Sequence, residues 1–221
     1  VLKIFFFIIG LSLEDKKNEK NLSSGVKLCN ALQGMGTTFI KLGQFLATRP
    51  DIIGEKTSKE LEKLQDKLPA FDLSDAKNIL KDELGENNFN KIIDISKPIA
   101  AASIAQVHFA TINVGEGSKN VAIKILRPNI EKIFNEELDA LMLLAYIIQN
   151  LVRKTKRLKL IEVVQLLREI TNVEMDLRFE AAAANELYEN TKNDVGFKVP
   201  KIYWSQTSKK VLCLEKVDGI S

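Results

Sequence analysis

The chain is poor in the residues that build metal centres and disulfide frameworks. It has two cysteines, Cys29 and Cys213, and a single histidine, His108. The cysteines lie far apart without metal-type spacing, which indicates a reducing compartment and no disulfide framework. His108 stands in an alternating apolar stretch with no cysteine or second histidine near it. We therefore predict a structural role for this histidine rather than a catalytic or metal-binding one.

The chain also lacks a membrane-length apolar run and a strong excess of one charge. Residues 1–13, VLKIFFFIIGLSL, are apolar, but a spanning helix needs about 20 such residues. We interpret residues 1–22 as a short packing or membrane-interface segment, or part of something longer, followed by a polar linker. The formal net charge of +3 does not indicate a nucleic-acid partner. The basic cluster at residues 153–159 is typical of a solvated connection between helices, which we favour over a membrane or nucleic-acid surface.

What the chain does contain is a stretch, residues 97–127, that is organised like a nucleotide-binding hairpin. A small-residue segment precedes an alternating run at 104–112 and a glycine-containing turn at 115–118. An apolar run follows at 121–126, and it contains Val-Ala-Ile-Lys with the lysine at Lys124. Two strands joined by a glycine turn after a tight loop are typical of such hairpins. The small-residue segment consists of Ala100, Ala101, Ala102 and Ser103.

Lys124 is the unusual residue of this hairpin, because a charge inside a Val/Ile run needs an acidic partner or a phosphate to offset its desolvation. Val-Ala-Ile-Lys is also the third-strand signature of protein kinases, whose lysine contacts the α- and β-phosphates of ATP. Taken alone, the motif fits equally an edge-strand lysine that reaches water.

The residues before the hairpin predict a helical extension of three helices. The first covers residues 26–48, is broken near the glycines in its middle, and carries Lys41 and Gln44 three positions apart on one face. The other two are expected at residues 59–68 and, after a cap at Ser74, at residues up to 84.

The residues after the hairpin predict two long helices, at about 129–152 and 160–190. The second contains the carboxylates Glu174, Asp176 and Glu180. On one straight helix Asp176 and Glu180 share a face whereas Glu174 points away, so these acids could serve two cations arriving from different sides.

Two more features complete the order of elements. The four alanines at residues 181–184 indicate the close approach of another backbone. Residues 201–204 and 210–217 are predicted to form a pair of strands.

Together these features resemble the UbiB family of atypical kinase-like proteins, which is associated with ubiquinone (coenzyme Q) biosynthesis. The motifs that carry the resemblance are Lys-Leu-Gly-Gln at Lys41 to Gln44 (KxGQ), the alanine-rich loop at Ala100 to Ser103, the third-strand Lys124, Glu-Met-Asp at Glu174 to Asp176 (ExD), and a hinge-like Leu214 to Gly219. The resemblance implies an α+β fold: a protein-kinase-like small lobe, with an antiparallel sheet and an αC-type helix, after a helical KxGQ extension and without the large lobe. The implied domains are residues 1–22, 23–86 and 87–221, the last truncated at the hinge.

The resemblance also implies roles for individual residues. Lys124 would contact nucleotide phosphates, paired with Glu180 as the αC glutamate, and the alanine-rich loop would lie over those phosphates. Lys41 and Gln44 would fold into the mouth of the site against Glu174 and Asp176, a regulatory arrangement that blocks a protein substrate. The cofactor would be ATP or ADP, with Mg²⁺ in the intact protein, although no metal ligands are expected in this chain.

The function implied is that of an atypical kinase or ATPase acting on small molecules in ubiquinone biosynthesis. No catalytic loop and no Asp-Phe-Gly can be read in the sequence, so we expect no catalysis by this chain alone and name no catalytic residue. The expected partners are a nucleotide, membrane lipid or ubiquinone precursors, and a separately encoded large lobe, at a cytoplasmic or peripheral inner-membrane location. The alternatives are a non-catalytic, pseudokinase-like binding module for lipid or ubiquinone-pathway proteins, and the remnant of a split gene.

Overall fold

A computed structural model describes residues 23–64, 68–115, 117–151 and 153–217. The apolar segment and linker predicted at residues 1–22, and the last residues of the hinge-like motif, lie outside this range. The chain divides into two compact units, each considered by itself. The helical unit comprises the described parts of residues 1–66 and 131–170, and the sheet unit those of residues 67–130 and 171–221.

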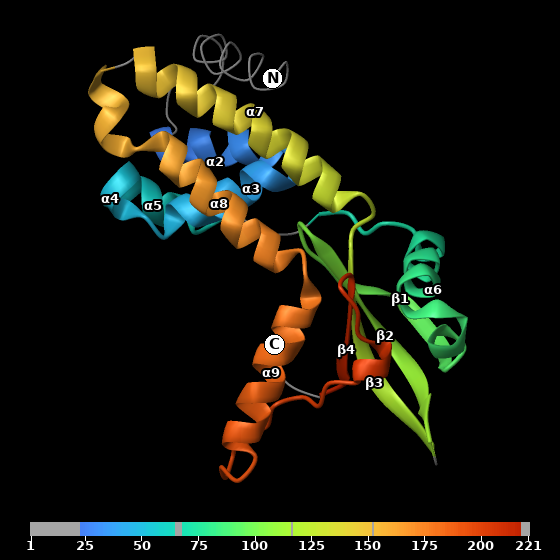
Figure 1. Cartoon of the computed structure of the whole chain (residues 1–221). Coiled ribbons are helices and arrows are strands. Elements are labelled where there is room, and N and C mark those ends of the chain that lie inside the picture. Colours follow the sequence, from blue (N-terminus) through green and yellow to red (C-terminus); the bar gives the residue numbers. More distant parts are fainter. Residues whose placement is uncertain (1–22, 65–67, 116, 152, 218–221) are drawn as a thin grey trace. The chain divides into compact units, whose positions relative to one another are not determined.

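The first part of the helical unit is a group of short helices (Figure 1). They are α2 (Ser24–Met35), α3 (Thr37–Ala47), α4 (Pro50–Ile53) and α5 (Glu55–Leu61). The predicted break in the first helix is confirmed, because Gly36 between α2 and α3 has a φ of 114° that side-chain-bearing residues rarely adopt. The helix predicted at 59–68 begins and ends earlier, as α5. Helix α3 ends at Ala47, close to the predicted end at residue 48. Pro50 then starts the single turn α4, since proline suits the first position of a helix.

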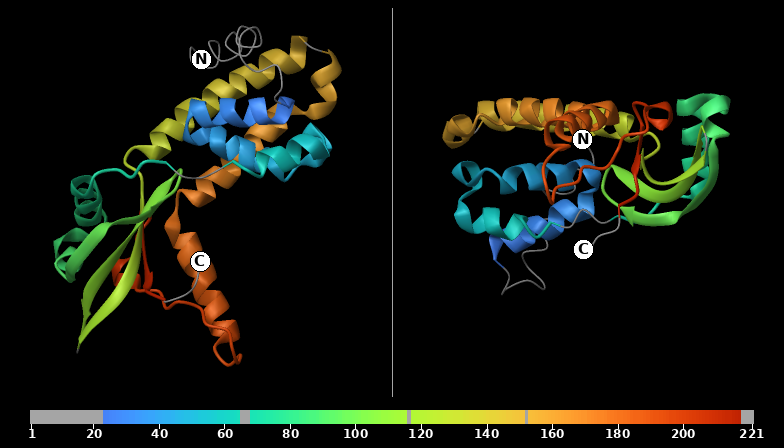
Figure 2. Two further views of the ribbon diagram at one scale, coloured as in Figure 1. Left: turned by 180° about the vertical axis from the view of Figure 1, so that it is seen from behind. Right: turned by 90° about the horizontal axis from the view of Figure 1, so that it is seen from below.

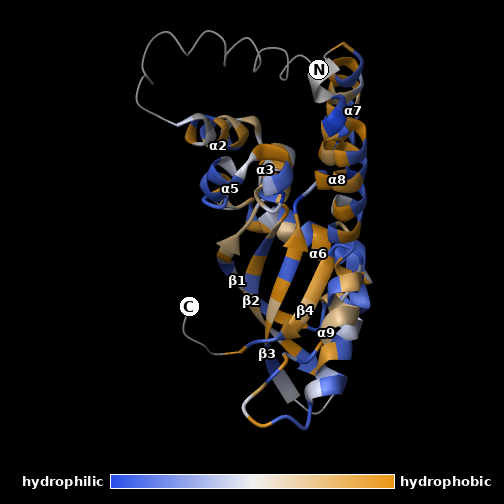
Figure 3. Ribbon diagram, turned by 90° about the vertical axis from the view of Figure 1, so that its left-hand side faces the viewer, coloured by the Kyte–Doolittle hydropathy of each residue, from blue (hydrophilic) through white to orange (hydrophobic). Residues whose placement is uncertain are grey.

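Two long helices complete the helical unit, α7 (Ile130–Leu151) and α8 (Leu160–Glu174). Both carry broad hydrophobic bands (Figure 3), and Arg168 of α8 donates to Asp139 of α7 at 2.6 Å. The 3₁₀ helix η1 (Arg153–Leu158) joins them and contains most of the basic cluster, whose members Lys156, Arg157 and Lys159 are exposed, as expected of a solvated connection. Among the described residues, none of the helices combines the length and apolarity needed to span a bilayer.

The sheet unit is built on four antiparallel strands in the order β1-β2-β3-β4. The strands are β1 (Ile92–Ala101), β2 (Ala105–Val114), β3 (Gly117–Leu126) and β4 (Val211–Glu215). The helices α6 (Leu73–Phe89) and α9 (Leu177–Thr191) lie on opposite sides of this sheet (Figures 1 and 2). The antiparallel sheet and flanking helices agree with the predicted kinase-like small lobe.

One face of the sheet forms the core with α6. Because successive side chains of a strand point to opposite faces, every second residue of β2, β3 and β4 is apolar and buried here. Ala76 and Leu80 of α6 are fully buried against this face. The strand residues in the cluster are Ala110, Ile112, Val121, Ile123, Ile125, Val211 and Cys213. The predicted extension, residues 23–86, thus includes a helix that packs on the sheet.

Helix α6 differs from its prediction at both ends. It begins at Leu73 after Asp72, one residue before the predicted cap at Ser74. Its predicted end at residue 84 is followed by Gly85, whose φ of 70° produces a kink, and helical residues then continue to Phe89.

The prediction of one helix over residues 160–190 is wrong. The chain leaves the helix after Glu174, and Asp176 caps α9 with an extended backbone (φ −124°, ψ 94°). The Asp176 side chain accepts from the backbone N–H of Arg178 at 3.1 Å, and the N–H of Leu177 is donated to the carbonyl of Lys209 at 2.9 Å. The shared helix face expected for Asp176 and Glu180 therefore does not exist.

Two further predictions need correction. Residues 201–204 form no strand: Ile202 makes an isolated bridge with Leu214, and a 3₁₀ helix, η2 (Trp204–Gln206), follows. The alanine run does not mark close packing along its length, because only Ala181 is buried while Ala182 and Ala183 are exposed. The strand expected at 210–217 is confirmed as β4.

His108 belongs to a buried polar network on the core side of the sheet. Its Nδ1 lies 2.8 Å from the carbonyl oxygen of Ser96, and its Nε2 lies 2.9 Å from Nε2 of Gln106. The Oε1 atom of Gln106 accepts from the N–H of Phe71, so its amide nitrogen is the donor toward His108. The imidazole therefore carries its proton on Nδ1 and is neutral, which supports the predicted structural role.

We expect the stability of the sheet unit to fall as the pH drops below about 6.5. Burial lowers the pKa of His108 from its ordinary value of 6.5, against a smaller opposing effect of the Ser96 carbonyl. The unfolded chain therefore binds a proton at this histidine more readily than the folded chain does. The contribution of neutral His108 to the stability of the fold is complete above pH 6.5 and is lost on acidification. An NMR titration of this single histidine measures the midpoint, and a midpoint at or above 6.5 would contradict the assignment.

Candidate functional site

The face of the sheet opposite the core carries Lys124. Its neighbours Ile123 and Ile125 point to the core, so the alternation of β3 directs Lys124 to the other side. There its Nζ lies 2.7 Å from Oε2 of Glu180, which stands in the first turn of α9. The pairing predicted for these two residues is thus present in the structure.

This ion pair is too accessible to act mainly as a stabilising contact. The side chains of Lys124 and Glu180 are 27% and 50% exposed, and pairs of this kind contribute roughly 0–1 kcal/mol. A cation on an inner strand, held by a carboxylate at the edge of solvent, is instead suited to meet an anionic ligand.

The sheet register aligns the alanine-rich loop with this lysine. Ala100 pairs with Val107, Val107 with Lys124, and Lys124 with Leu212. Partners in an antiparallel register share a face, so Ala100 lies in the same row as Lys124.

The four loop residues differ in their surroundings. Ala100 and Ala101 end β1, and Ala102 and Ser103 form the turn into β2. Ala100 is exposed, Ala101 and Ala102 are half-buried, and Ser103 is fully buried. Contact with a ligand over the sheet would therefore fall to the alanines rather than to the Ser103 side chain.

The next row on this face was not anticipated from the sequence. Phe109 pairs with Ala122, and the ammonium of Lys216 lies 4.4 Å from the centre of the Phe109 ring. Together with Asp94, Ser96, Thr111 and Asn120, among others, these two side chains line a pocket of about 220 Å³. The alternation of β2, with Phe109 two residues after Val107, was the signal that could have located it.

The Glu-Met-Asp motif lies at the junction between α8 and α9. Glu174 is the last residue of α8, and Asp176 is the cap of α9. The guanidinium of Arg178, at 2.6 and 2.9 Å, holds the pKa of the Asp176 carboxyl below its usual range. The Asp176 carboxylate therefore accepts its hydrogen bonds from Arg178, in the first turn of the helix that it caps.

Lys41 and Gln44 lie half-buried on α3, in the helical unit, whereas Glu174 and Asp176 belong to the sheet unit. Their predicted meeting across the mouth of the site stays a prediction. The residue between them, Gly43, is buried, and a Cβ added to it would come within 2.2 Å of Leu64 Cδ1. The glycine of this motif thus allows close packing inside the helical unit.

The described residues include no group of three His, Cys, Asp or Glu side chains placed to hold a metal ion. Glu180, the carboxylate nearest to the predicted phosphate site, is already bound to Lys124. The thiols are unsuited as ligands, since burial raises the pKa of Cys213 to about 12.

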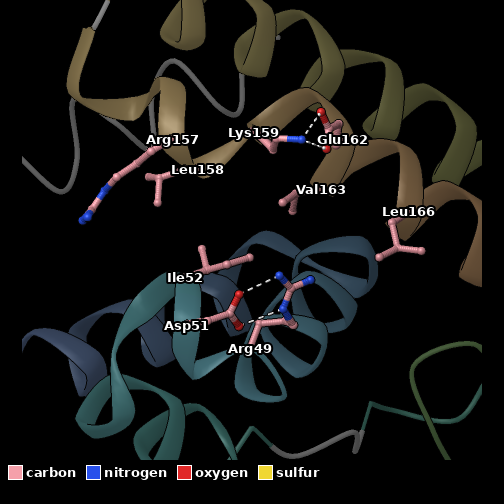
Figure 4. A pocket seen from close by; sticks show the side chains of 9 residues that line it. All are labelled: Arg49, Asp51, Ile52, Arg157, Leu158, Lys159, Glu162, Val163 and Leu166. Carbon is pink, nitrogen blue, oxygen red and sulfur yellow. Dashed lines mark hydrogen bonds and ion pairs between the residues drawn. The ribbon is translucent and has the colours of Figure 1, made fainter.

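A second pocket, of about 270 Å³, lies within the helical unit between α4 and the start of α8 (Figure 4). Arg49, Arg157 and Lys159 are among its lining residues. Arg49 is paired with Asp51 at 2.7 Å, and Lys159 with Glu162 at 2.9 Å. An anion entering this pocket would have to compete with these carboxylates for two of the three cations.

Comparison with known proteins gives consistent matches. A model of the ABC1 atypical kinase-like domain matches residues 63–221. Proteins named "Probable protein kinase UbiB" are similar over most of the chain: 36% identical over 99% of it in Marinobacter nauticus, 38% over 93% in Histophilus somni and 34% over 91% in Cellvibrio japonicus. The chain spans 39%, 38% and 36% of the lengths of these relatives.

Proposed function

This chain belongs to the ABC1 atypical kinase-like family, with relatives named UbiB, and we propose that its sheet unit binds an adenine nucleotide. The observation that carries the proposal is the Lys124–Glu180 pair, 2.7 Å apart on the open face of the sheet. Lys124 would contact the phosphates, as the third-strand lysine of kinases does. The backbone of Ala100 to Ala102, in the same row, would cover them.

The base would lie farther along the same face. The row formed by Phe109, Ala122 and Leu214 is the next one across the sheet, and it offers apolar surface for an aromatic ring. The pocket lined by Phe109 and Lys216 borders this row. An aromatic side chain and a cation near each other suit a base and its attached polar groups.

We place this nucleotide site in an atypical kinase or ATPase that serves ubiquinone biosynthesis, the pathway implied by the family resemblance. Residues 1–221 contain no readable catalytic loop or Asp-Phe-Gly, so the direct test for this chain is binding rather than turnover. Lipid, ubiquinone precursors and a large lobe remain proposed partners of the whole protein.

The test is calorimetric titration of the full chain with ATP and ADP, with and without Mg²⁺. We expect Lys124→Met to weaken binding by about tenfold or more, because a hydrogen bond to a charged group contributes roughly 1.5–3 kcal/mol. The matched control is Lys210→Met, which removes another sheet-unit lysine paired with a carboxylate, Glu83, at 3.1 Å. Absence of binding by the unaltered chain, or equal weakening by both variants, would refute the proposal.

A further inference from the structure

The alanine-rich loop is bonded to Arg127, a residue that no motif of the sequence singled out. The Nε and Nη2 atoms of Arg127 donate to the carbonyl oxygen of Ala102 at 3.0 and 2.8 Å. Its backbone N–H donates to the carbonyl oxygen of Ile104 at 2.8 Å. Arg127 thus bonds to two loop carbonyls, one on each side of Ser103: its side chain to Ala102 and its backbone N–H to Ile104.

The loop needs such an external hold because its own side chains are small. Within the turn, the N–H of Ala102 is donated to the carbonyl of Ala105 at 2.8 Å. The methyl groups of the three loop alanines cannot add hydrogen bonds to this closure, so Ser103 is the one loop residue whose side chain is polar. The two Arg127 side-chain bonds join residues 25 positions apart in the chain, so they fix the loop from outside.

The guanidinium of Arg127 is itself held in place from a third direction. Its Nη2 also donates to the carbonyl oxygen of Pro69 at 2.9 Å, and the group lies 5.9 Å from the centre of the Phe71 ring. Phe71 is fixed in turn, because its N–H and C=O both bond to the buried amide of Gln106, at 2.9 and 3.2 Å. Pro69 and Phe71, which precede α6, therefore hold the Arg127 side chain in the position from which it bonds to the loop.

Arg127 follows Lys124 by three positions, directly after β3 ends. The same strand therefore sets the place of the ammonium and, through Arg127, the place of the loop. A shift of either relative to the other would require the end of β3 to move.

We propose that Arg127 is a positioning residue for phosphate binding. By its bonds to Ala102 it fixes the position of the alanine-rich loop relative to Lys124. This inference rests on the proposed nucleotide site. The part of the ligand that the positioned loop would contact is the diphosphate of the nucleotide. The planar guanidinium is needed, since its Nε and Nη2 donate side by side to one carbonyl oxygen while Nη2 also reaches a second one. The single nitrogen of a lysine ammonium lacks this fixed fork.

The experiment compares the unaltered full chain with Arg127→Lys, which keeps the positive charge and removes the paired Nε and Nη2 donors. Two readouts are used: ADP affinity by calorimetry, and amide hydrogen exchange by residue. We expect ADP affinity to fall about tenfold, with faster exchange confined to residues 100–105. The matched control is Arg168→Lys, whose arginine pairs with Asp139 in the helical unit; it should leave ADP affinity unchanged.

The outcomes separate this inference from the proposed function. If the unaltered chain binds no ADP, the nucleotide site itself is refuted. If it binds ADP and Arg127→Lys binds equally well, only the positioning role is refuted. Faster exchange throughout β2 and β3 in the variant would show a general structural role and would also overturn the proposal.

A second variant covers the case in which Arg127→Lys does not fold. Phe71→Leu removes the ring near the guanidinium and leaves the carbonyl acceptors of Arg127 at Ala102, Ile104 and Pro69 in place. We expect a smaller loss of ADP affinity, about two- to threefold, again with faster exchange at residues 100–105. Unchanged affinity and unchanged exchange at the loop would count against the positioning role.

Discussion

Replacing Leu80 by alanine is expected to lower the free energy of unfolding of the sheet unit by about 2–5 kcal/mol. Leu80 is fully buried and belongs to the cluster that joins α6 to the sheet. Shortening it removes apolar contacts with strand residues and leaves a cavity that a closely packed sheet cannot readily fill.

The measurement is urea unfolding of the full chain, followed by the fluorescence of Trp204. This is the only tryptophan of the sequence, and it lies in η2 of the sheet unit. The matched control is Lys77→Ala on the exposed side of the same helix, which should change stability by less than about 0.5 kcal/mol. A similar small change for Leu80→Ala would mean that α6 does not pack on the sheet.

Gly43→Ala is expected to destabilise the helical unit by about 1–3 kcal/mol. The new methyl group would come within 2.2 Å of Leu64 Cδ1 and 2.9 Å of Leu32 Cδ1. Both leucines are buried, at 6% and 3% exposure, so neither can move aside without disturbing its own neighbours. The alanine's better helix propensity, about 1 kcal/mol, offsets only part of this cost.

The matched control is Gly34→Ala in α2, where no atom lies within 4 Å of the added methyl group. It should be neutral or stabilising. The readout is the rate at which a thiol reagent labels Cys29, which is 8% exposed and lies in the helical unit. Gly43→Ala should speed labelling of Cys29 and leave that of Cys213, in the sheet unit, unchanged; equal rates at Cys29 in both glycine variants would contradict the packing explanation.

The sequence allowed prediction of those features that depend on local periodicity. The alternation of apolar residues placed Lys124 on a strand. Its partner Glu180 was implied by the family resemblance rather than by periodicity, and the two side chains are 2.7 Å apart. The break at Gly36 was predictable because glycine there relieves a backbone conformation that other residues avoid.

Features set by contacts between distant segments could not be predicted in the same way. Residues 160–190 have the composition of one helix, and aspartate is tolerated within helices. The chain leaves the helix at Asp176, where the N–H of Leu177 donates to the carbonyl of Lys209, a partner that no local pattern identifies. The bond between Arg127 and Pro69, 58 positions apart, is equally invisible to periodicity, although an arginine beside an apolar strand end was a signal to examine.

The path of the chain between β3 and α9 has a consequence for the candidate site. Lys124 and Glu180 are separated by 56 positions, and most of the residues between them, 131–170, belong to the other compact unit. While residues 131–170 are folded, they do not behave as a long flexible loop between the two charged residues. If they melted, the sheet unit would have to keep α9, and with it the carboxylate, on the sheet against the entropy of closing a long loop. Ligand affinity at the sheet would then report whether the helices are intact, even without any direct contact from them.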